Sequence, residues 1–418
     1  MKIAVIGAGV SGMSLARMLG GRHEVTVFEA AARPGGLIKC ERVGGSLYHK
    51  VGGHVFNSKR QDVLDWFWAI FDRGRDFHKA TRHAVVSLAG GGRVDYPIEN
   101  HLYQMPVDMR RRVIADLLQI QKEGYGEPAN FEDFLKARFG QTLYEEYFHP
   151  YNRKIWAGRS LAEVPLAWLA GKLPMPTIAE IMEANIGRAD ETAMVHSSFW
   201  YPLNGGSQFL ADGLASGLDI SFNTPVDRME RQGGTWVVNG ERFDRVFYTG
   251  NARALPSLIG GELDLHEHAA AVQQLEYHGT TSVLCEVDVN PYSWIYMPSP
   301  EHESHRIICT GNFSPNNDAS PRTTATIEFS REMAREEIEA QLARIPFHPR
   351  YIAHHWEPCS YPVQTGATKG IIDGLKAALH PQGFYLLGRF AEWEYYNMDA
   401  AIGAALDLVA TLSKEQAV

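Results

Sequence analysis

The sequence predicts an α/β fold, in which a Rossmann-type dinucleotide-binding domain carries an inserted helical domain and an antiparallel β-sheet substrate domain. Two observations lead to this prediction. A strand, a glycine-rich turn and a helix open the chain, and a strand, a glycine turn and an alanine-rich helix close it. The chain has 418 residues, which is too long for one ordinary core, so the sequence between these motifs should form further packed units.

The opening motif has the pattern of a dinucleotide-binding fingerprint. Residues 2–6 (KIAVI) form a β-branched run, and Gly7, Gly9 and Gly12 follow as GxGxxG before a helical segment. The first glycine permits a tight turn, the second lets the backbone approach a pyrophosphate, and the third allows the helix to pack closely on the strand. Glu29 ends the next strand, where a carboxylate can accept hydrogen bonds from an adenosine ribose. We therefore expect a bound dinucleotide.

Two further segments indicate which dinucleotide is bound. EAAARPGG follows the second strand and LLGRFAEW lies near the C-terminus, and both resemble segments of FAD-binding oxidoreductases of the glutathione-reductase and amine-oxidase type. The resemblance implies FAD as the cofactor. The cofactor-binding residues expected here are Arg33, Gly35, Gly36, Gly388, Arg389, Asn397 and Met398. No cysteine or histidine stands in a recognisable flavin-attachment motif, so the FAD should be held non-covalently.

Between these motifs the sequence changes from helical to strand-like. From Asn130 to Leu173 apolar residues recur at helical spacing, which predicts a helical insertion. Alternating segments bounded by Gly, Asn or Pro then predict an antiparallel sheet, and they are residues 221–230, 235–240, 245–250, 280–289 and 323–330. The predicted units are FAD-binding segments at 1–95, 201–260 and 366–418, a mainly helical insertion at 96–200 and a sheet domain at 261–365.

The composition argues against several classes of function. A net charge of −9 gives no general attraction to nucleic acid or to an anionic membrane, and no apolar run is long enough to span a bilayer. Four separated cysteines without a CxxC pair indicate neither a zinc site nor a disulfide framework. The N-terminal residues enter the glycine turn directly and do not resemble a signal peptide. We expect a cytoplasmic protein that acts on a small molecule without a metal, with a homodimer as one option for its assembly.

Further segments resemble UDP-galactopyranose mutase, a flavoenzyme family that interconverts the pyranose and furanose rings of a nucleotide sugar without net redox change. The likeness runs over most of the chain in the family's order. It comprises HKVGGHVFNS (49–58), DYPIENHLYQMP (95–106), PYNRKIWAGRSLAEVP (150–165), YPLNGG (201–206), SYPV (360–363) and GRFAEWEYYNM (388–398). PYNRKIW and AEWEYYNM are its more specific parts, because the glycine turns and YPLNGG also occur in the wider amine-oxidase and protoporphyrinogen-oxidase group.

The resemblance implies roles for individual aromatic residues. Tyr151 and Trp156 match the family's uridine-site tyrosine and its substrate-pocket tryptophan, while Tyr361 and Tyr395 match tyrosines that contact the diphosphate. Asn397 stands where the family has an aspartate. A single Tyr or Trp is more often packed in the core of a protein than placed in a binding site. A substrate pocket is favoured here because all of these residues occur in the same order as in the family.

A glycine-histidine loop contributes a second set of expected site residues. Gly53 and His54 match the family loop that lies beside the isoalloxazine ring of the flavin, and Asn57 replaces the second histidine of that loop. Two interpretations of His54 are open: a side chain that lies beside the flavin, or a buried histidine whose ring nitrogens are hydrogen-bonded within the protein.

The chain departs from the family at the substrate diphosphate. The two arginines that clamp the diphosphate in the family appear here as Pro176 and Trp294. Arginine is the natural bidentate partner of phosphate, and a buried dianion without such partners is costly. Either other cations replace them or the substrate differs. Arg82 and Arg153 are the best candidates to replace the two missing arginines. Arg188 is a third candidate, but its polar surroundings favour a solvent-exposed side chain without a binding role.

The resemblance also implies a mechanism. In the mutase reaction, N5 of reduced flavin attacks the anomeric carbon, the nucleotide leaves, and the sugar ring opens and recloses while bound to the flavin. The alternative is an FAD-dependent oxidoreductase, like an amine oxidase or a desaturase, that acts on a substrate without a diphosphate. A catalytically idle FAD-binding protein is the least favoured of the three. The sequence favours the mutase-like interpretation and leaves the substrate itself open.

Overall fold

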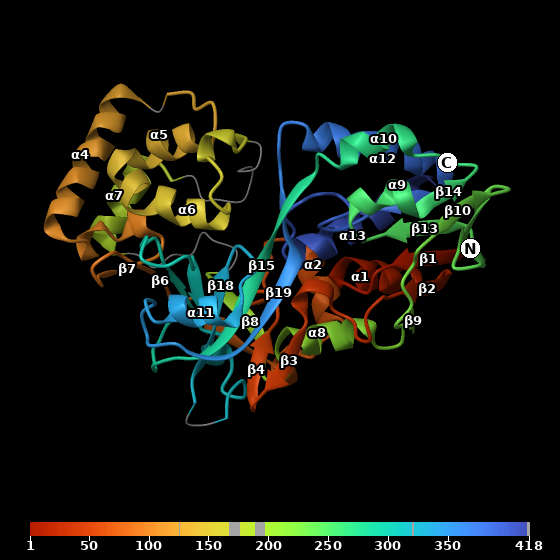
Figure 1. The fold of residues 1–418 in the computed structure, drawn as a ribbon, viewed down its shortest axis with the longest axis horizontal. Helices are drawn as coiled ribbons and strands as arrows, with labels where there is room; N and C mark the ends of the chain where they lie inside the picture. The colour runs from red at the N-terminus through yellow and green to blue at the C-terminus, as the bar shows by residue number, and fades with distance from the viewer. Residues whose placement is uncertain (125, 167–175, 189–196, 320–321, 416–418) are drawn as a thin grey trace.

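A computed structural model describes residues 1–124, 126–166, 176–188, 197–319 and 322–415. Figure 1 shows a layered region of sheets and helices that contains both labelled termini, a helical region at the opposite end of the molecule, and long strands that run between the two. The predicted α/β fold class is confirmed.

A parallel sheet of five strands forms the dinucleotide-binding core. Its strands, in spatial order, are β20 (Phe384–Leu386), β13 (Arg245–Tyr248), β1 (Lys2–Ile6), β2 (Glu24–Phe28) and β9 (Asp219–Ser221). β1 lies at the centre and is almost completely buried, as expected for a parallel strand covered on both faces. The helices α1 (Val10–Leu19), α8 (Gly206–Ala215) and α13 (Met398–Glu415) share one apolar core with this sheet. Segments from the whole length of the chain therefore build this one sheet.

A smaller four-stranded sheet lies next to the dinucleotide-binding sheet. It contains β12 (Glu241–Phe243), β11 (Thr235–Val238), β10 (Met229–Gln232) and β14 (Ile259–Gly261). The helices α9 (Leu255–Leu258), α10 (His266–Val272) and α12 (Thr368–Leu379) contribute to the same apolar core. Trp236 is fully buried in this core, and its indole N–H donates to the backbone oxygen of Gln382.

The third sheet has seven strands, in the order β19 (Arg350–Val363), β15 (Glu276–Glu286), β18 (Thr324–Phe329), β17 (Arg306–Ile308), β16 (Trp294–Tyr296), β6 (Ala84–Ser87) and β7 (Arg93–Asp95). Its pairs are antiparallel except β16 with β6. Of the five segments predicted to form an antiparallel sheet, residues 280–289 and 323–330 contribute to it, but residues 245–250 contain β13 of the parallel sheet, so the prediction is wrong for that segment. One expected boundary is wrong: β6 and β7 lie within residues 1–95 but belong to this sheet, because the buried run AVVS pairs with β16. α11 (Arg335–Leu342) packs on the same sheet.

The helical region contains α4 (Val107–Glu123), α5 (Phe131–Leu143), α6 (His149–Ile155) and α7 (Ile178–Gly187), with a π-helical turn at 144–148 between α5 and α6. Its core continues into the seven-stranded sheet through Trp294 and Tyr296. The remaining elements are the hairpin β3 (Cys40–Val43) and β4 (Ser46–His49), the pair β5 (Phe77–Thr81) and β8 (Ser198–Pro202), and the helices α2 (Gln61–Trp68) and α3 (Arg73–Asp76).

Candidate functional site

The glycine turn between β1 and α1 has the geometry that a pyrophosphate site needs. Gly7 has a φ of +105°, which disfavours any residue with a side chain. A Cβ atom on Gly12 would lie 2.1 Å from the backbone oxygen of Gly7, so the helix and the turn are in direct contact there. A Cβ atom on Gly9 would meet no protein atom within 4 Å. The backbone of Gly9 thus faces open space at the N-terminus of α1, where a phosphate binds favourably.

Glu29 holds this turn from the end of β2. Its carboxylate accepts a 2.8 Å hydrogen bond from the backbone N–H of Ala8 and a 2.9 Å bond from that of Ala31. The backbone N–H of Gly35 donates to the backbone oxygen of Ala8 at 2.8 Å. The segment after β2 is therefore tied to the glycine turn. Arg33, which was expected to contact the cofactor, is exposed and lies 4.0 Å from Asp212.

The C-terminal motif completes the same cavity. A Cβ atom on Gly388 would lie 2.7 Å from the hydroxyl oxygen of Ser11 in α1, so the two ends of the chain are in contact. Arg389 donates to the backbone oxygens of Tyr396 and Ser360. The cavity between the two motifs is lined by Gly9, Val10, Ser11, Gly35, Gly36, Leu37, Ile38, His54, Thr249, Arg389, Phe390, Tyr396, Asn397, Met398 and Ala401. Seven of the residues predicted to bind the cofactor line it.

His54 lies on the wall of this cavity. Its Nε2–H donates to the backbone oxygen of Leu37 at 3.0 Å. Burial, together with the charge of Arg389, lowers the pKa of His54 to about 4, so the ring is neutral at physiological pH. Gly53, next to it, packs against β17, since a Cβ atom there would lie 2.5 Å from Cγ2 of Ile308. Asn57 is oriented by a 2.8 Å bond to the backbone oxygen of Ser198.

A second cavity, of about 210 Å³, lies between the helical region and the seven-stranded sheet. Its wall includes three residues predicted from the sequence: Trp156, Tyr361 and Tyr395. The other lining residues are Asn152, Ile155, His278, His305, Arg306, Ser330 and Pro362. The segment from Tyr395 to Met398 separates this cavity from the first one, because Tyr395 lines the second and the next three residues line the first.

Stacked rings form one side of the second cavity. The ring of Tyr361 lies between those of His278 and Tyr395, at centroid distances of 5.0 and 5.6 Å and nearly parallel to both. The guanidinium of Arg389 lies 4.8 Å from the centre of the Tyr395 ring. Arg389 also lines the cofactor cavity, so the wall between the two cavities is one packed unit of Arg389 and these rings.

A buried ion pair, absent from the sequence-based predictions, lies at this wall, which Arg306 lines and Glu328 does not. Arg306 on β17 and Glu328 on β18 are direct cross-strand partners, and Nε of Arg306 donates to Oε2 of Glu328. Nη2 of Arg306 donates to the hydroxyl oxygen of Tyr361 at 2.8 Å. Nε2 of His305 lies 3.4 Å from the same carboxylate. Burial opposes ionisation of Glu328, but Arg306 and His305 outweigh it and hold the pKa of the carboxyl at about 2.

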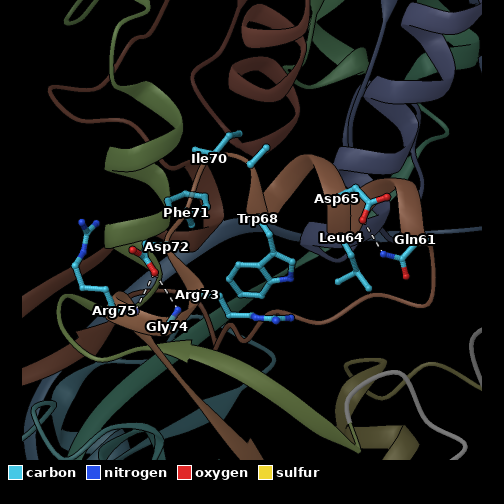
Figure 2. A pocket seen from close by; sticks show the side chains of 11 residues that line it. Gln61, Leu64, Asp65, Trp68, Ile70, Phe71, Asp72, Arg73, Gly74 and Arg75 are labelled. Carbon is cyan, nitrogen blue, oxygen red and sulfur yellow. Dashed lines mark hydrogen bonds between the residues drawn. The ribbon is translucent and has the colours of Figure 1, made fainter.

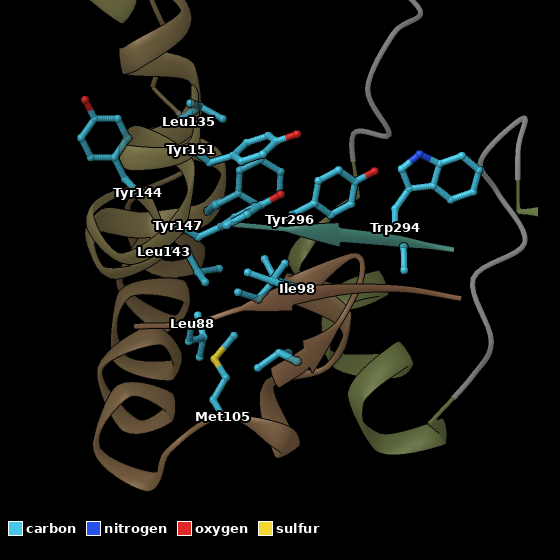
Figure 3. Close-up of a cluster of buried hydrophobic side chains, with 14 of the residues drawn as sticks. Leu88, Ile98, Met105, Leu135, Leu143, Tyr144, Tyr147, Tyr151, Trp294 and Tyr296 are labelled. Carbon is cyan, nitrogen blue, oxygen red and sulfur yellow. The ribbon is translucent and has the colours of Figure 1, made fainter. Parts of the chain in front are cut away.

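Tyr151 and Trp294 lie in the core of the helical region. The ring of Tyr151 stacks on Tyr147 at 5.5 Å and meets the edge of Tyr296 at 5.4 Å, and Figure 3 shows these rings together with Trp294. Tyr151 therefore packs beside the second cavity and does not line it. Arg82 joins the group, because its guanidinium lies 5.0 Å from the centre of the Trp294 ring and donates to the hydroxyl of Tyr296.

The remaining residues considered at or in place of the missing arginines, Pro176, Arg153 and Arg188, do not line the second cavity. Pro176 is half-buried and directly precedes Thr177, the N-cap of α7. Arg153 is exposed on α6. Arg188 is exposed at the end of α7, with its guanidinium 5.0 Å from the centre of the Tyr103 ring. The segment between Pro174 and Gly205 contains α7 and β8, and its residues 189–196 lie outside the described residues, as does the end of the expected helical stretch at 167–173.

A surface groove along α2 and α3 contains none of the predicted site residues. Figure 2 shows its lining, in which Arg73 lies beside Trp68 and Asp72 accepts hydrogen bonds from the backbone of Gly74 and Arg75. The groove is open and lies apart from the two cavities. Within the described part of the chain, no helix is both long enough and apolar enough to cross a membrane.

Comparisons with known proteins agree with this arrangement. Residues 5–73 match the family model of an NAD(P)-binding Rossmann-like domain. The chain is 21% identical to dTDP-fucopyranose mutase of Escherichia coli, and the alignment covers 97% of each protein. Its structure matches reduced UDP-galactopyranose mutase with a TM-score of 0.87 at 21% identity, over 99% of this chain and 94% of that one. A structure from an Exiguobacterium species assigned as a protoporphyrinogen oxidase matches with a TM-score of 0.76 at 18% identity, over 99% of both chains.

These matches cover the N-terminal motif, the inserted regions and the C-terminal motif in one alignment. The first cavity has the features of a dinucleotide site, with open space for a pyrophosphate at Gly9, and His54 lies in its wall. The chain therefore has the fold of UDP-galactopyranose mutase and of related oxidases, and its first cavity has the geometry of the dinucleotide site that the sequence predicts for FAD.

Proposed function

We propose that the protein is a mutase that interconverts the pyranose and furanose forms of a nucleotide-activated sugar. The observation that carries this proposal is the position of the second cavity. It lies directly behind Tyr395 and Arg389, which separate it from the FAD cavity, and it is lined by three of the four aromatic residues that the mutase resemblance assigns to the substrate, Trp156, Tyr361 and Tyr395. The end-to-end similarity to a dTDP-fucopyranose mutase supports the same class of reaction.

Reduced FAD supplies an electron-rich N5 atom that can act as a nucleophile toward an anomeric carbon. The chain's own residues would bind and orient the sugar and exclude water. Trp156 and Tyr395 provide apolar walls against which a sugar ring can pack. Tyr361 accepts a hydrogen bond from Arg306, which leaves its own O–H free to donate into the cavity. Burial raises the pKa of Tyr361, so this hydroxyl keeps its proton.

The test uses purified protein with its FAD reduced by dithionite under anaerobic conditions. UDP-linked and dTDP-linked pyranoses are added, and the products are separated by chromatography and examined by NMR for furanose rings. The proposal expects furanose formation with reduced protein, none with oxidised protein, and no oxygen consumption. The variant Trp156→Ala should slow turnover, because Trp156 lines the second cavity. Its FAD spectrum should be unchanged, because Trp156 does not line the FAD cavity. Absence of ring interconversion across the panel would argue against a mutase.

An oxidoreductase is the second candidate, and one observation favours it. Positions 176 and 294 hold proline and tryptophan where the mutase resemblance expects arginines, and the same fold occurs in a structure assigned as an oxidase. An oxidoreductase would start with oxidised FAD and would be reduced by its own substrate. Stopped-flow absorbance near the flavin band distinguishes the two. Stoichiometric bleaching by a substrate without a diphosphate would support the oxidoreductase.

A further inference from the structure

Lys154 binds one connection of the seven-stranded sheet with all of its hydrogen-bond donors. The residue lies on α6, and its ammonium donates to the backbone oxygens of Met297, Ser299 and Ser304 at 2.8, 2.5 and 2.9 Å. All three oxygens belong to residues 297–305, the connection between β16 and β17. An ammonium has three N–H donors, so these bonds use the full donor capacity of Lys154.

The surroundings of this ammonium disfavour a positive charge. Burial lowers the pKa of Lys154 to about 7. The nearby His302 is buried too, and burial together with the charge of Lys154 lowers its pKa to about 4, so its ring is neutral. Among the described residues, no carboxylate forms an ion pair with Lys154. A charge in the interior without a counter-ion is costly, so the three hydrogen bonds are what stabilises the ammonium at this place.

The connection depends on the same contact. Ser299, His302 and Ser304 are buried, although they lie between two strands and belong to neither. Buried backbone oxygens need donors. The backbone oxygen of Ser304 also lies 3.1 Å from Nδ1 of His302. Loss of the Lys154 ammonium would therefore take a donor from all three oxygens and leave one of them with the histidine alone.

Through these bonds Lys154 joins the two walls of the second cavity. On the side of the helical region, Trp156 lies two residues after Lys154 and lines the cavity. On the side of the sheet, His305 and Arg306 directly follow Ser304 and line the cavity. Lys154 itself is not among the lining residues. Its bonds thus hold the two walls together from a position outside the space that a ligand would fill.

We propose that Lys154 is a positioning residue of the second cavity and that it holds Trp156 at a fixed distance from Arg306. This inference rests on the proposed function, because it takes the second cavity as the place where a nucleotide sugar binds and reacts. A reaction slows steeply when the groups around the substrate are misplaced by about 1 Å. The orientation of the sugar over the flavin therefore depends on a side chain that does not contact the sugar.

Replacing Lys154 with Met tests this role, because methionine keeps most of the side-chain length and removes the donors. With reduced FAD and UDP- or dTDP-linked pyranoses, kcat should fall by about ten- to a hundred-fold. KM should rise by less than about ten-fold, since the ligand still enters but is held out of alignment. FAD content should be unchanged, because Lys154 does not line the FAD cavity. Lys154→Arg keeps the charge and the donors, so its kcat should lie within about three-fold of the wild type.

Hydrogen exchange followed by mass spectrometry measures the restraint directly and needs no substrate. In Lys154→Met, the amides of residues 152–159 and 297–306 should exchange at least about ten-fold faster than in the wild type, and Lys154→Arg should restore their protection. All measurements are made at pH 6.0, where the ammonium of Lys154 is protonated.

Lys136→Met is the matched control. Lys136 is a partly buried lysine in the same helical region, it donates to Glu132 on its own helix, and it does not line the cavity. Its turnover, and the exchange of both segments, should match the wild type. If Lys154→Met does not fold, Lys154→Gln replaces it. Glutamine keeps two N–H donors, so the changes should have the same direction and a smaller size.

The outcomes separate this role from the proposed function. If folded Lys154→Met turns over like the wild type, or leaves the exchange of both segments unchanged, the role of Lys154 is wrong and the mutase proposal stands. Equal losses in Lys154→Met and Lys154→Arg also overturn the role, because they would show that the donors are not what holds the walls. If the wild type converts no nucleotide sugar, the proposed function fails, and hydrogen exchange alone decides whether Lys154 holds the two walls together.

Discussion

The guanidinium of Arg82 lies over the indole of Trp294, 5.0 Å from the ring centre. Trp294 stands where the mutase resemblance expects one of the two diphosphate arginines, so a positive charge is present next to the altered position although it comes from a different segment. Tyr96 and Tyr296 lie on other sides of the same guanidinium, at 5.3 and 5.9 Å from their ring centres. The charge of Arg82 is thus held by aromatic faces, and no carboxylate forms an ion pair with it among the described residues.

Replacing Arg82 with Ala should weaken binding of UDP or dTDP by about ten- to a hundred-fold, which corresponds to the loss of one charge-assisted contact of about 1.5–3 kcal/mol. FAD content should be unchanged, because Arg82 does not line the FAD cavity. Calorimetry measures the affinity, and the ratio of flavin to protein absorbance measures the cofactor. Arg153→Ala is the control and should bind normally. If Arg82→Ala lowers only the melting temperature, the residue has a packing role alone.

Substitution of Gly9 should remove the cofactor and leave the fold in place. A valine side chain at this position would project into the space that the pyrophosphate needs, and its Cβ atom would meet no protein atom within 4 Å. We expect Gly9→Val to purify with less than about a tenth of the wild-type FAD content. The control is Gly21→Val, which also has open space but lies away from the cavity. Normal flavin content in Gly9→Val would show that the cofactor lies elsewhere.

The FAD should leave the protein intact when the fold is lost. Among the described residues, no cysteine lines the cavity, and the one histidine that lines it, His54, is neutral. Denaturation by acid or heat, followed by chromatography of the supernatant, should recover free FAD in a ratio near one to one with the protein, and the precipitate should be colourless. Yellow colour that stays with the precipitate would indicate a covalent bond.

The pH dependence of the free energy of unfolding should reflect the protonation of the buried side chain of His49. This side chain is fully buried and its Nε2 lies 2.8 Å from the hydroxyl of Tyr201. Burial, and then the charge of His54, lowers its pKa to about 3. Below about pH 6.5 the unfolded state takes up a proton that the folded state refuses, so the free energy of unfolding falls as the pH drops toward 3, by at most about 1.4 kcal/mol per pH unit for this group.

Denaturant titrations at pH 7.5, 6.0 and 5.0 test this expectation. The variant His49→Gln should be less stable at pH 7.5 but should lose less stability than the wild type between pH 7.5 and 5.0. His266→Gln is the control, because the side chain of His266 is exposed, and its pH dependence should match the wild type. If the free energy of unfolding of His49→Gln falls with decreasing pH as steeply as that of the wild type, groups other than His49 cause the loss of stability in acid.

Local patterns in the sequence were sufficient to predict the glycine turn and most of the residues that line the first cavity's two motifs. The spacing of Gly7, Gly9 and Gly12 between a strand and a helix determines a turn geometry that depends on few distant contacts. The C-terminal helix also begins at the expected residue, Met398. These motifs are local, so their physical requirements can be read from short segments.

The substrate side could be predicted only in part. Trp156, Tyr361 and Tyr395 were named from their resemblance to a family, and the fold brings them to one cavity. Arg306 and Glu328 were missed because nothing in their local sequence marks them, and they become partners only when β17 pairs with β18. The short strands β6 and β7 lie within the predicted FAD-binding segment 1–95 but pair in the seven-stranded sheet, and a short run of apolar residues does not indicate its pairing partner.

The order of strands in the five-stranded sheet has a consequence for how the protein is made. β1 and β2 leave the ribosome early, β9 and β13 follow after the helical region has been synthesised, and β20 comes after residue 383. The N-terminus of α13, which lines the flavin cavity, emerges later still. Because domains that fold during synthesis begin with the segments that are available, the nascent chain carries an incomplete sheet for most of its translation. Capture of the flavin is therefore a late event in the biogenesis of this protein, after every strand of the sheet has been translated.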